Sequence, residues 1–253
     1  MLEAYLKAEN LKMKHSLFGR LILLVPAALV LSSIVLIYVG VGLGAFSGVI
    51  VCNWCMPMAS LTVVVLCHLV NGKDQKHQNR TLYSLPINLK KLFISKSILT
   101  ALCFLSITLV MAFITVTAEC ISSGIPAAIG MTGYYILGYL LLWSTILWQI
   151  PFCLFLEQKI GFAGSVIINL FASALGGIFL YLTPLFWIFP HSWPARIMAA
   201  FFGVMTNGLL VPEGSRLILS LGESVLLIFT ALFFTFALSA LFSHWYRKQV
   251  YRK

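Results

Sequence analysis

The chain has 253 residues, of which 60% are hydrophobic and only 9% are charged, and its mean hydropathy is +0.99. A soluble domain carries about 25% charged residues, so this composition excludes an ordinary soluble domain and indicates a polytopic membrane protein. A net charge of +10 is also typical of nucleic-acid-binding proteins, but the sequence lacks interleaved aromatic and basic motifs. We attribute the charge to membrane orientation and contact with anionic lipid, and expect no nucleic-acid partner.

Residues 1–15 predict an amphipathic helix that lies along the membrane surface. Leu2, Tyr5, Leu6 and Met13 fall near one helical face, whereas the polar residues fall elsewhere. The alternative is a solvated tail. The segment is too polar for the apolar region of a signal peptide, so we recognise no cleavable signal.

Six apolar runs follow, each close to the ~20 residues that a membrane span requires. They cover about residues 17–41, 47–70, 97–117, 131–156, 162–182 and 220–243. We therefore expect an all-α membrane protein whose 253 residues form a single transmembrane domain.

The basic residues lie almost entirely on one side of these runs. Of the 17 Lys and Arg residues, all except Arg196 and Arg216 lie near the start of the first run, in the second or fourth connection, or after the sixth run. The positive-inside rule makes this side cytoplasmic. The sequence thus predicts six spans with both termini in the cytoplasm.

Residues 183–219 form an extracytoplasmic loop that is unusually apolar. The loop holds four prolines, Trp187, Trp193 and a short apolar run at 197–205. We expect it to re-enter the outer leaflet as one or two short helices, with both tryptophans at the interface. The alternative is a seventh, broken span, which would place the C-terminal basic cluster outside.

Known catalytic motifs are missing from the sequence. It contains no GxxxxGK[ST], HExxH or GxSxG pattern, so we expect neither an enzyme nor a cofactor or metal bound by this chain. Cys52 and Cys55 have CxxC spacing, but they lie in an apolar run, where structural thiols are favoured over a redox or metal site. His191 is either a hydrated loop residue or a contact for an external ligand.

Residues 72–96 form the long basic connection between the second and third runs. Asn79–Tyr83 can form a short helix, which Pro86 ends or turns. Positive-inside charge explains the lysines of this loop, but it does not explain Leu82, Tyr83, Leu85 and Ile87. Apolar side chains on a short exposed helix indicate docking of a protein partner.

This stretch resembles a known family. A polar run, then "LYSLPI", then a basic segment and "SK" at the next span, is similar to the first cytoplasmic loop of ABC-2 type transporter permeases. The stretches "YLKAENLKMKHSLFGRLILLVP", "CNWCMPM" and "WIFPHSWPARIM…TNGLLVP" resemble the permeases of lantibiotic immunity transporters. The family pattern gives no role to the cysteines of "CNWC".

The resemblance implies a permease subunit in a bacterial cell membrane that expels a lantibiotic and so gives immunity or resistance. It implies a partner ATP-binding cassette subunit in two copies, which carries ATP and Mg²⁺, and a second, different permease. The coupling contacts would be Asn79, Arg80, Thr81, Leu82, Tyr83, Leu85 and Pro86. Substrate contacts near the outer side would be Trp54, Trp187, His191 and Trp193.

Two other functions fit the sequence. One is an ABC-2 permease that exports another drug, such as a bacitracin-like compound, or a lipid. The other is a membrane sensor or scaffold that transports nothing and has no ATPase partner.

Overall fold

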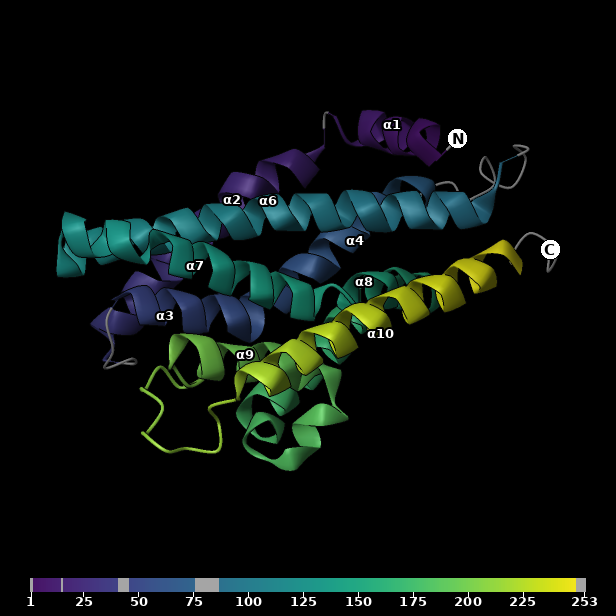
Figure 1. Ribbon diagram of the computed structural model, residues 1–253. Coiled ribbons are helices and arrows are strands. Elements are labelled where there is room, and N and C mark those ends of the chain that lie inside the picture. The colour runs from purple at the N-terminus through teal and green to yellow at the C-terminus, as the bar shows by residue number, and fades with distance from the viewer. Residues whose placement is uncertain (1, 15, 41–45, 76–86, 249–253) are drawn as a thin grey trace.

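The protein is a bundle of long apolar helices (Figure 1). A computed structural model describes residues 2–14, 16–40, 46–75 and 87–248. In chain order the long helices are α1 (Leu2–Met13), α2 (Leu17–Tyr38), α3 (Phe46–Asn53), α4 (Ala59–Gln75), α6 (Leu89–Ser123), α7 (Ile125–Ile146), α8 (Gln149–Ile178), α9 (Trp193–Phe202) and α10 (Leu221–Lys248). Short helical turns are η1 (Trp54–Met58), η2 (Leu180–Leu182), η3 (Pro184–Trp187) and η4 (Pro190–Ser192). Extended pairing within the described chain is limited to one isolated bridge between Val204 and Leu210.

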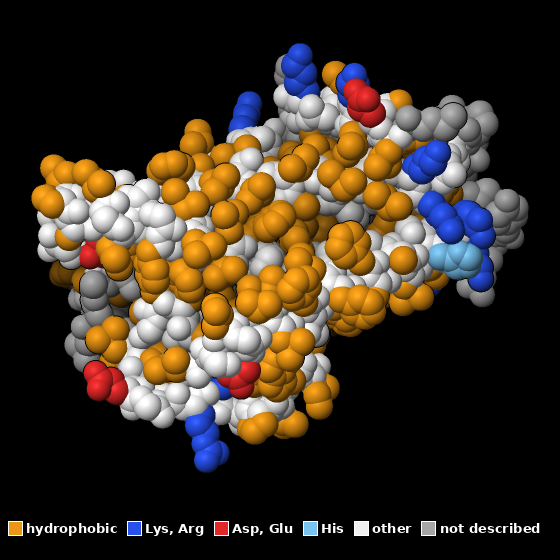
Figure 2. All heavy atoms as spheres, viewed as in Figure 1, with side chains coloured by type: hydrophobic (Ala, Val, Ile, Leu, Met, Phe, Trp, Pro, Cys, Tyr) orange, Lys and Arg blue, Asp and Glu red, His pale blue; other side chains and the backbone are white. Residues whose placement is uncertain are grey.

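Five stretches are long and apolar enough to cross a membrane. They are Leu17–Tyr38, Phe46–Asp74, Leu89–Ser123, Ile125–Leu182 and Leu221–Lys248. Large apolar side chains such as Leu23, Phe233 and Phe236 are more than 70% exposed, and apolar surface covers the middle of the molecule (Figure 2). Such a surface is stable in hydrocarbon and costly in water. The fold is therefore that of an all-helical polytopic membrane protein.

The centre of the bundle is the broken helix formed by α3, η1 and α4. In its most apolar stretch 67% of the residues are buried, against 17% for α2 and 11% for α10. Met56 has non-helical angles of φ −139° and ψ 114° next to Pro57, and a proline inside a helix is a usual cause of such a kink. Trp54 is fully buried here, and its ring centroid lies 5.7 Å from that of Phe104 on α6.

Helices α6 and α7 form a long antiparallel pair (Figure 1). The Asn88 side chain begins α6 by accepting hydrogen bonds from the backbone N–H groups of Lys90 and Lys91. Gly124, at φ 87°, ends α6, and a proline in the first turn of α7 starts the return. The third apolar run is thus longer than predicted, because helix reaches 89 at one end and 123 at the other.

Helix α8 reverses its direction at Gly161. This residue has φ 77° and ψ 180°, which breaks the helix into two arms. On a straight helix Gln149 and Asn169 would be about 30 Å apart, yet Asn169 Nδ2 lies 3.3 Å from Gln149 Oε1. The arms therefore lie side by side and antiparallel, and the reversal coincides with the predicted link between the fourth and fifth runs.

The outer loop predicted at 183–219 contains η3, η4 and α9, followed by turns. Trp193 is buried against Trp148 and Phe234, with ring centroids 6.5 and 5.9 Å away. The guanidinium of Arg196 donates to the carbonyl oxygens of Tyr181 and Arg216. The loop is a compact helical segment, and its position relative to the two leaflets stays a prediction.

Candidate functional site

The most prominent polar feature of the bundle is a buried network of charged groups centred on Lys96. Lys96 is only 1% exposed, and its Nζ lies 2.7 Å from Asp74 Oδ2 and 3.2 Å from Asn71 Oδ1. Asp74 lies near the end of α4 and Lys96 lies two turns into α6. A buried ammonium is costly unless it is paired and hydrogen-bonded, so this geometry fixes α4 against α6.

The network extends to the N-terminal helix. Lys12 Nζ lies 2.6 Å from Glu9 Oε1 and 3.1 Å from Asp74 Oδ1. Lys73 adds a hydrogen bond from its ammonium to the carbonyl oxygen of Lys12. Asp74 thus bridges two lysines, one on α1 and one on α6. Helix α1 is therefore attached to the bundle by charge as well as by apolar contact.

The start of α6 is also attached to α1. The backbone N–H of Asn88 donates to the Tyr5 hydroxyl at 2.8 Å. Residues on both borders of 76–86 therefore contact the same N-terminal helix.

The other end of the network reaches the hairpin α8. Asn71 Nδ2 donates to Glu157 Oε2 and to the carbonyl oxygen of Leu154, both at 3.2 Å. Glu157 Oε1 lies 2.7 Å from His68 Nδ1. Glu157 is 3% exposed and lies one turn before the reversal at Gly161. Four helices, α1, α4, α6 and α8, are consequently connected through one continuous polar path.

This path lies at the end of the bundle where the basic residues gather. Lys and Arg side chains collect around α1, the start of α6 and the end of α10 (Figure 2). Sequence reasoning assigned Lys96 to a basic loop facing lipid headgroups; the structure instead buries it, because Asp74 supplies a counter-charge inside the bundle. The predicted loop 72–96 is correspondingly shorter, since α4 continues to Gln75 and α6 begins at Leu89.

The predicted coupling residues Asn79, Arg80, Thr81, Leu82, Tyr83, Leu85 and Pro86 lie outside the described residues. Their docking role stays a prediction. The described chain nevertheless defines the two borders of this segment: Asp74 on one border belongs to the charged network, and Asn88 on the other is bonded to α1.

The predicted outer contacts lie in different environments. Trp54 and Trp193 are buried in the core, and Trp187 is half-buried. His191 is 7% exposed rather than hydrated, so of the four only Trp187 presents much surface in this conformation. Contact of these four residues with a substrate stays a prediction.

His191 belongs to a second polar cluster, between the outer loop and the bundle. Its Nε2 donates to Asn169 Oδ1 at 3.0 Å, and Asn169 Nδ2 donates to the carbonyl oxygen of Ser60 at 3.1 Å. Ser173 donates to the Ser60 hydroxyl at 2.8 Å. Burial lowers the pKa of His191 to about 4, so the imidazole is neutral at physiological pH. The cluster fastens η4 to α4 and α8.

A cavity of about 240 Å³ opens at the end of the bundle opposite the charged network. Glu119 and Tyr135 line it together with Phe202 and Val204. The Tyr135 hydroxyl donates to Glu119 Oε2 at 3.0 Å, and Ser123 donates to Glu119 Oε1 at 2.5 Å. A carboxylate among aromatic rings favours cationic or amphipathic ligands.

Within the described residues, the cysteines and the acidic side chains form no additional redox or metal site. All six cysteines are free, and the Cys52 thiol donates to the carbonyl oxygen of Thr206 at 2.9 Å. Among the residues that the structure describes, no three His, Cys, Asp or Glu side chains gather as metal ligands would.

Comparison with protein-family models, with curated proteins and with solved structures gives no match to this chain. Fold and site therefore define the class of protein, an all-helical membrane protein with a buried charged network at one end.

Proposed function

We propose that this chain is the transmembrane permease subunit of an ABC-2 type exporter that expels a lantibiotic, or a similar antimicrobial peptide, from a bacterial cell membrane. ATP and Mg²⁺ bind to a separate cassette subunit, which docks on the segment around residues 79–86. The observation that carries the proposal is the Lys96–Asp74 ion pair and the network around it.

A permease subunit that binds no nucleotide depends on the conformational change of its ATPase partner. That change must act on a surface segment of the permease and be transmitted from there to the spans. The borders of residues 76–86 meet this requirement mechanically. Asp74 on one border and Lys96 beyond the other are joined to each other and, through Lys12 and Glu157, to α1 and α8. Closely packed, hydrogen-bonded groups move together. A displacement of the segment is therefore delivered to four helices at once.

The proposal includes six spans with both termini in the cytoplasm. The stretch Ile125–Leu182 has 58 residues, which as one straight helix is about 87 Å, far longer than the ~30 Å hydrocarbon core. The reversal at Gly161 supports two passes within it. The gathering of basic side chains at one end of the bundle supports the orientation (Figure 2).

The choice of substrate rests on the sequence resemblance, and the outer cavity at Glu119 is compatible with a cationic amphipathic peptide. Export of a bacitracin-like drug or of a lipid is the main rival. A sensor or scaffold without transport is the second.

Docking is tested with Tyr83→Asp and Leu85→Asp in the full, affinity-tagged chain. We expect a cassette ATPase to co-purify with the unaltered chain from membranes of its own cell, and to be lost from either variant. Asn10→Asp, which adds the same charge on exposed α1, is the matched control and should retain the ATPase. Retention by all three variants contradicts the docking role, and absence of any ATPase from the unaltered chain supports the sensor or scaffold.

The substrate is tested by survival. Cells that express the chain with its partner subunits should tolerate higher concentrations of at least one lantibiotic than cells that carry Leu85→Asp. Protection against bacitracin alone favours the drug exporter. Unchanged survival on every lantibiotic overturns the immunity function.

A further inference from the structure

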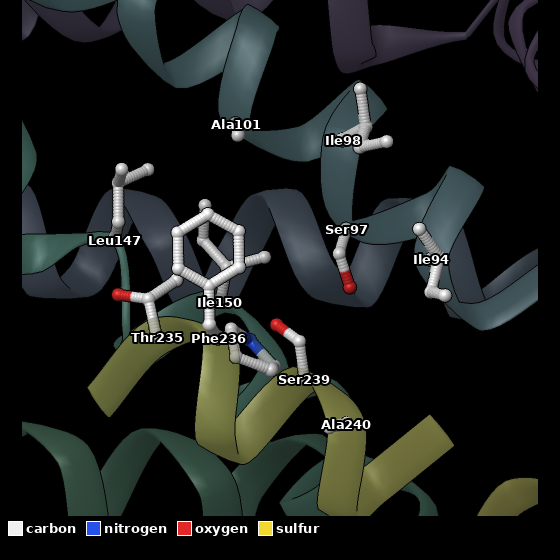
Figure 3. A pocket seen from close by; sticks show the side chains of 11 residues that line it. Ile94, Ser97, Ile98, Ala101, Leu147, Ile150, Thr235, Phe236, Ser239 and Ala240 are labelled. Atoms are coloured by element: carbon white, nitrogen blue, oxygen red, sulfur yellow. The ribbon is translucent and has the colours of Figure 1, made fainter. Parts of the chain in front are cut away.

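A second, larger cavity lies inside the membrane-spanning part of the bundle, away from both polar clusters. Its volume is about 510 Å³, and it lies between α6, α10 and the junction of α7 with α8. Figure 3 shows Ile94, Ile98 and Ala101 of α6 opposite Phe236 and Ala240 of α10, with Ile150 behind them. The cavity is an open, apolar groove rather than an enclosed core defect.

Of the three hydroxyls that line the groove, all except that of Ser239 are used by their own helices. Ser97 donates to the carbonyl oxygen of Phe93 at 3.0 Å, and Thr235 donates to that of Ala231 at 2.8 Å. The groove therefore offers almost no free hydrogen-bonding capacity, and its occupant must present hydrocarbon to it.

The faces of α6 and α10 that line the groove carry basic side chains at one end of it. On α6, Lys90 is one turn before Ile94. On α10, His244 is one turn after Ala240 and Arg247 follows three residues later. At this end of the molecule, Lys and Arg side chains gather beside a histidine near the end of α10 (Figure 2).

Within the described residues, no carboxylate of the protein pairs with the cations at the end of the groove. In the described part of the chain, Lys90, Arg247 and Lys248 form no ion pair. The nearby carboxylates of Asp74 and Glu157 are instead held by Lys96, Lys12 and His68. The cluster thus repels itself unless an anion joins it.

The groove, measured along α6 from its basic end, is about as long as the hydrocarbon layer of one leaflet is thick. From Lys90 to Ala101 α6 rises about 16 Å, which is close to half of the ~30 Å hydrocarbon core. A ligand that meets the cations with its headgroup thus has its acyl chain beside Ile94, Ile98 and Ala101.

We propose that the groove between α6 and α10 is a binding site for an anionic phospholipid, whose phosphate headgroup meets Lys90, His244, Arg247 and Lys248 and whose acyl chain lies along Ile98 and Phe236. The leaflet is the one on the side of both termini. The site depends on the membrane-spanning character of the chain and is independent of any transport function.

The groove could be occupied by a lipid or by a helix from a second copy of this chain, and the charge at its end favours an anionic lipid. A helix from a second copy of this chain would be equally apolar, but it would bring the same uncompensated cations to the same end. An anionic lipid supplies the missing negative charge, and Lys and Arg near a membrane surface each favour anionic lipid.

The test is native mass spectrometry of the full chain in detergent, titrated with phosphatidylglycerol or with phosphatidylcholine of identical acyl chains. We expect phosphatidylglycerol to bind more tightly. The variant Lys90→Gln/Arg247→Gln/Lys248→Gln should lose this preference, on the order of fivefold for each cation removed. The control Lys7→Gln/Lys14→Gln/Arg20→Gln removes as many cations from the same end and should keep it. Equal binding of the two lipids, or equal loss in both variants, overturns the proposal.

The groove itself is tested with Ala240→Phe, which fills it. Ala237→Phe adds the same ring to the same helix at an exposed position outside the groove. We expect Ala240→Phe to reduce binding of both lipids and Ala237→Phe to leave it unchanged. If Ala240→Phe instead changes the oligomeric state and leaves lipid binding intact, a second copy occupies the groove and the proposal is wrong.

Discussion

Lys96 Nζ lies 2.7 Å from Asp74 Oδ2, so a buried ion pair joins the two helices that border residues 76–86. Lys96, at 1% exposed, is the most deeply buried lysine among the residues that the structure describes. Breaking a buried pair leaves a charge without its partner, whereas replacing both groups removes the penalty. This difference gives a direct test of the network.

Lys96→Met should destabilise the protein by about 3 kcal/mol, because Asp74 then keeps only Lys12 and Asn71 loses its donor. The double variant Lys96→Met/Asp74→Leu should be more stable than Lys96→Met alone. Thermal unfolding in detergent measures both. Lys7→Met is the control, since Lys7 pairs with Glu3 on the exposed face of α1 and such pairs contribute little. A loss in the control as large as that in Lys96→Met would show that the network has no special role in stability.

Gly176 sets the close approach of the outer loop to α8. A Cβ at this position would lie 2.8 Å from the His191 carbonyl carbon and from the Ser192 nitrogen, which are backbone atoms that cannot rotate away. Gly176→Ala should therefore displace η4 and cost about 1–3 kcal/mol.

The matched variant is Gly133→Ala, at an exposed position of α7 where nothing lies within 4 Å of the added Cβ. It should raise stability by up to about 1 kcal/mol, because alanine favours a helix over glycine. Hydrogen exchange of α9 measures whether the outer loop is loosened. Equal protection of α9 in both variants would contradict the packing role of Gly176.

His191 should make the outer loop sensitive to acid. Its pKa is lowered to about 4 by burial, whereas an exposed histidine titrates near 6.5. The unfolded state therefore binds a proton between these values and the folded state does not. Stability is fully present above pH ~6.5 and falls by about 3 kcal/mol as the pH drops to ~4.

The control is His191→Gln, which does not titrate and retains a donor for Asn169. His68 and His244 remain in both proteins, so only the difference between their profiles reports on His191. The rings beside His191, those of Trp148, Phe152 and Phe189, carry no titratable group. Parallel stability profiles from pH 7 to pH 4 would exclude His191 as the cause.

The positions of the apolar helices could be predicted from sequence because hydropathy acts locally. Each predicted run overlaps a helical stretch of the structure, although the first run extends past the end of α2 at Tyr38 and the sixth begins one residue before α10. The link at Gly161 and the kink at Pro57 follow from the properties of single residues. The prediction of the helix ends was less accurate around residues 72–96. Local charge predicted a loop there, whereas a counter-charge from another helix keeps Lys96 inside.

The charged network could not be predicted because its members are far apart in the chain. Glu9, Asp74, Lys96 and Glu157 show no common spacing, and only the fold brings them together. A weak signal existed, since four of the seven acidic residues (Glu3, Glu9, Asp74 and Glu157) lie on the side that carries the lysines. The burial of Trp54 and Trp193 was missed for a related reason, because tryptophan is equally typical of interfaces and cores.

Helix α6 runs without interruption over 35 residues, which contain neither proline nor glycine. Lys96 lies near one end and Glu119 near the other, about 34 Å apart at the usual helical rise. The central helix formed by α3, η1 and α4 is broken at Met56, and α8 reverses its direction at Gly161. Neither is therefore a continuous rigid helix across the membrane. Helix α6 is continuous over this distance. A displacement of its charged end is therefore transmitted as rigid-body motion to Glu119, which lines the cavity at the opposite end.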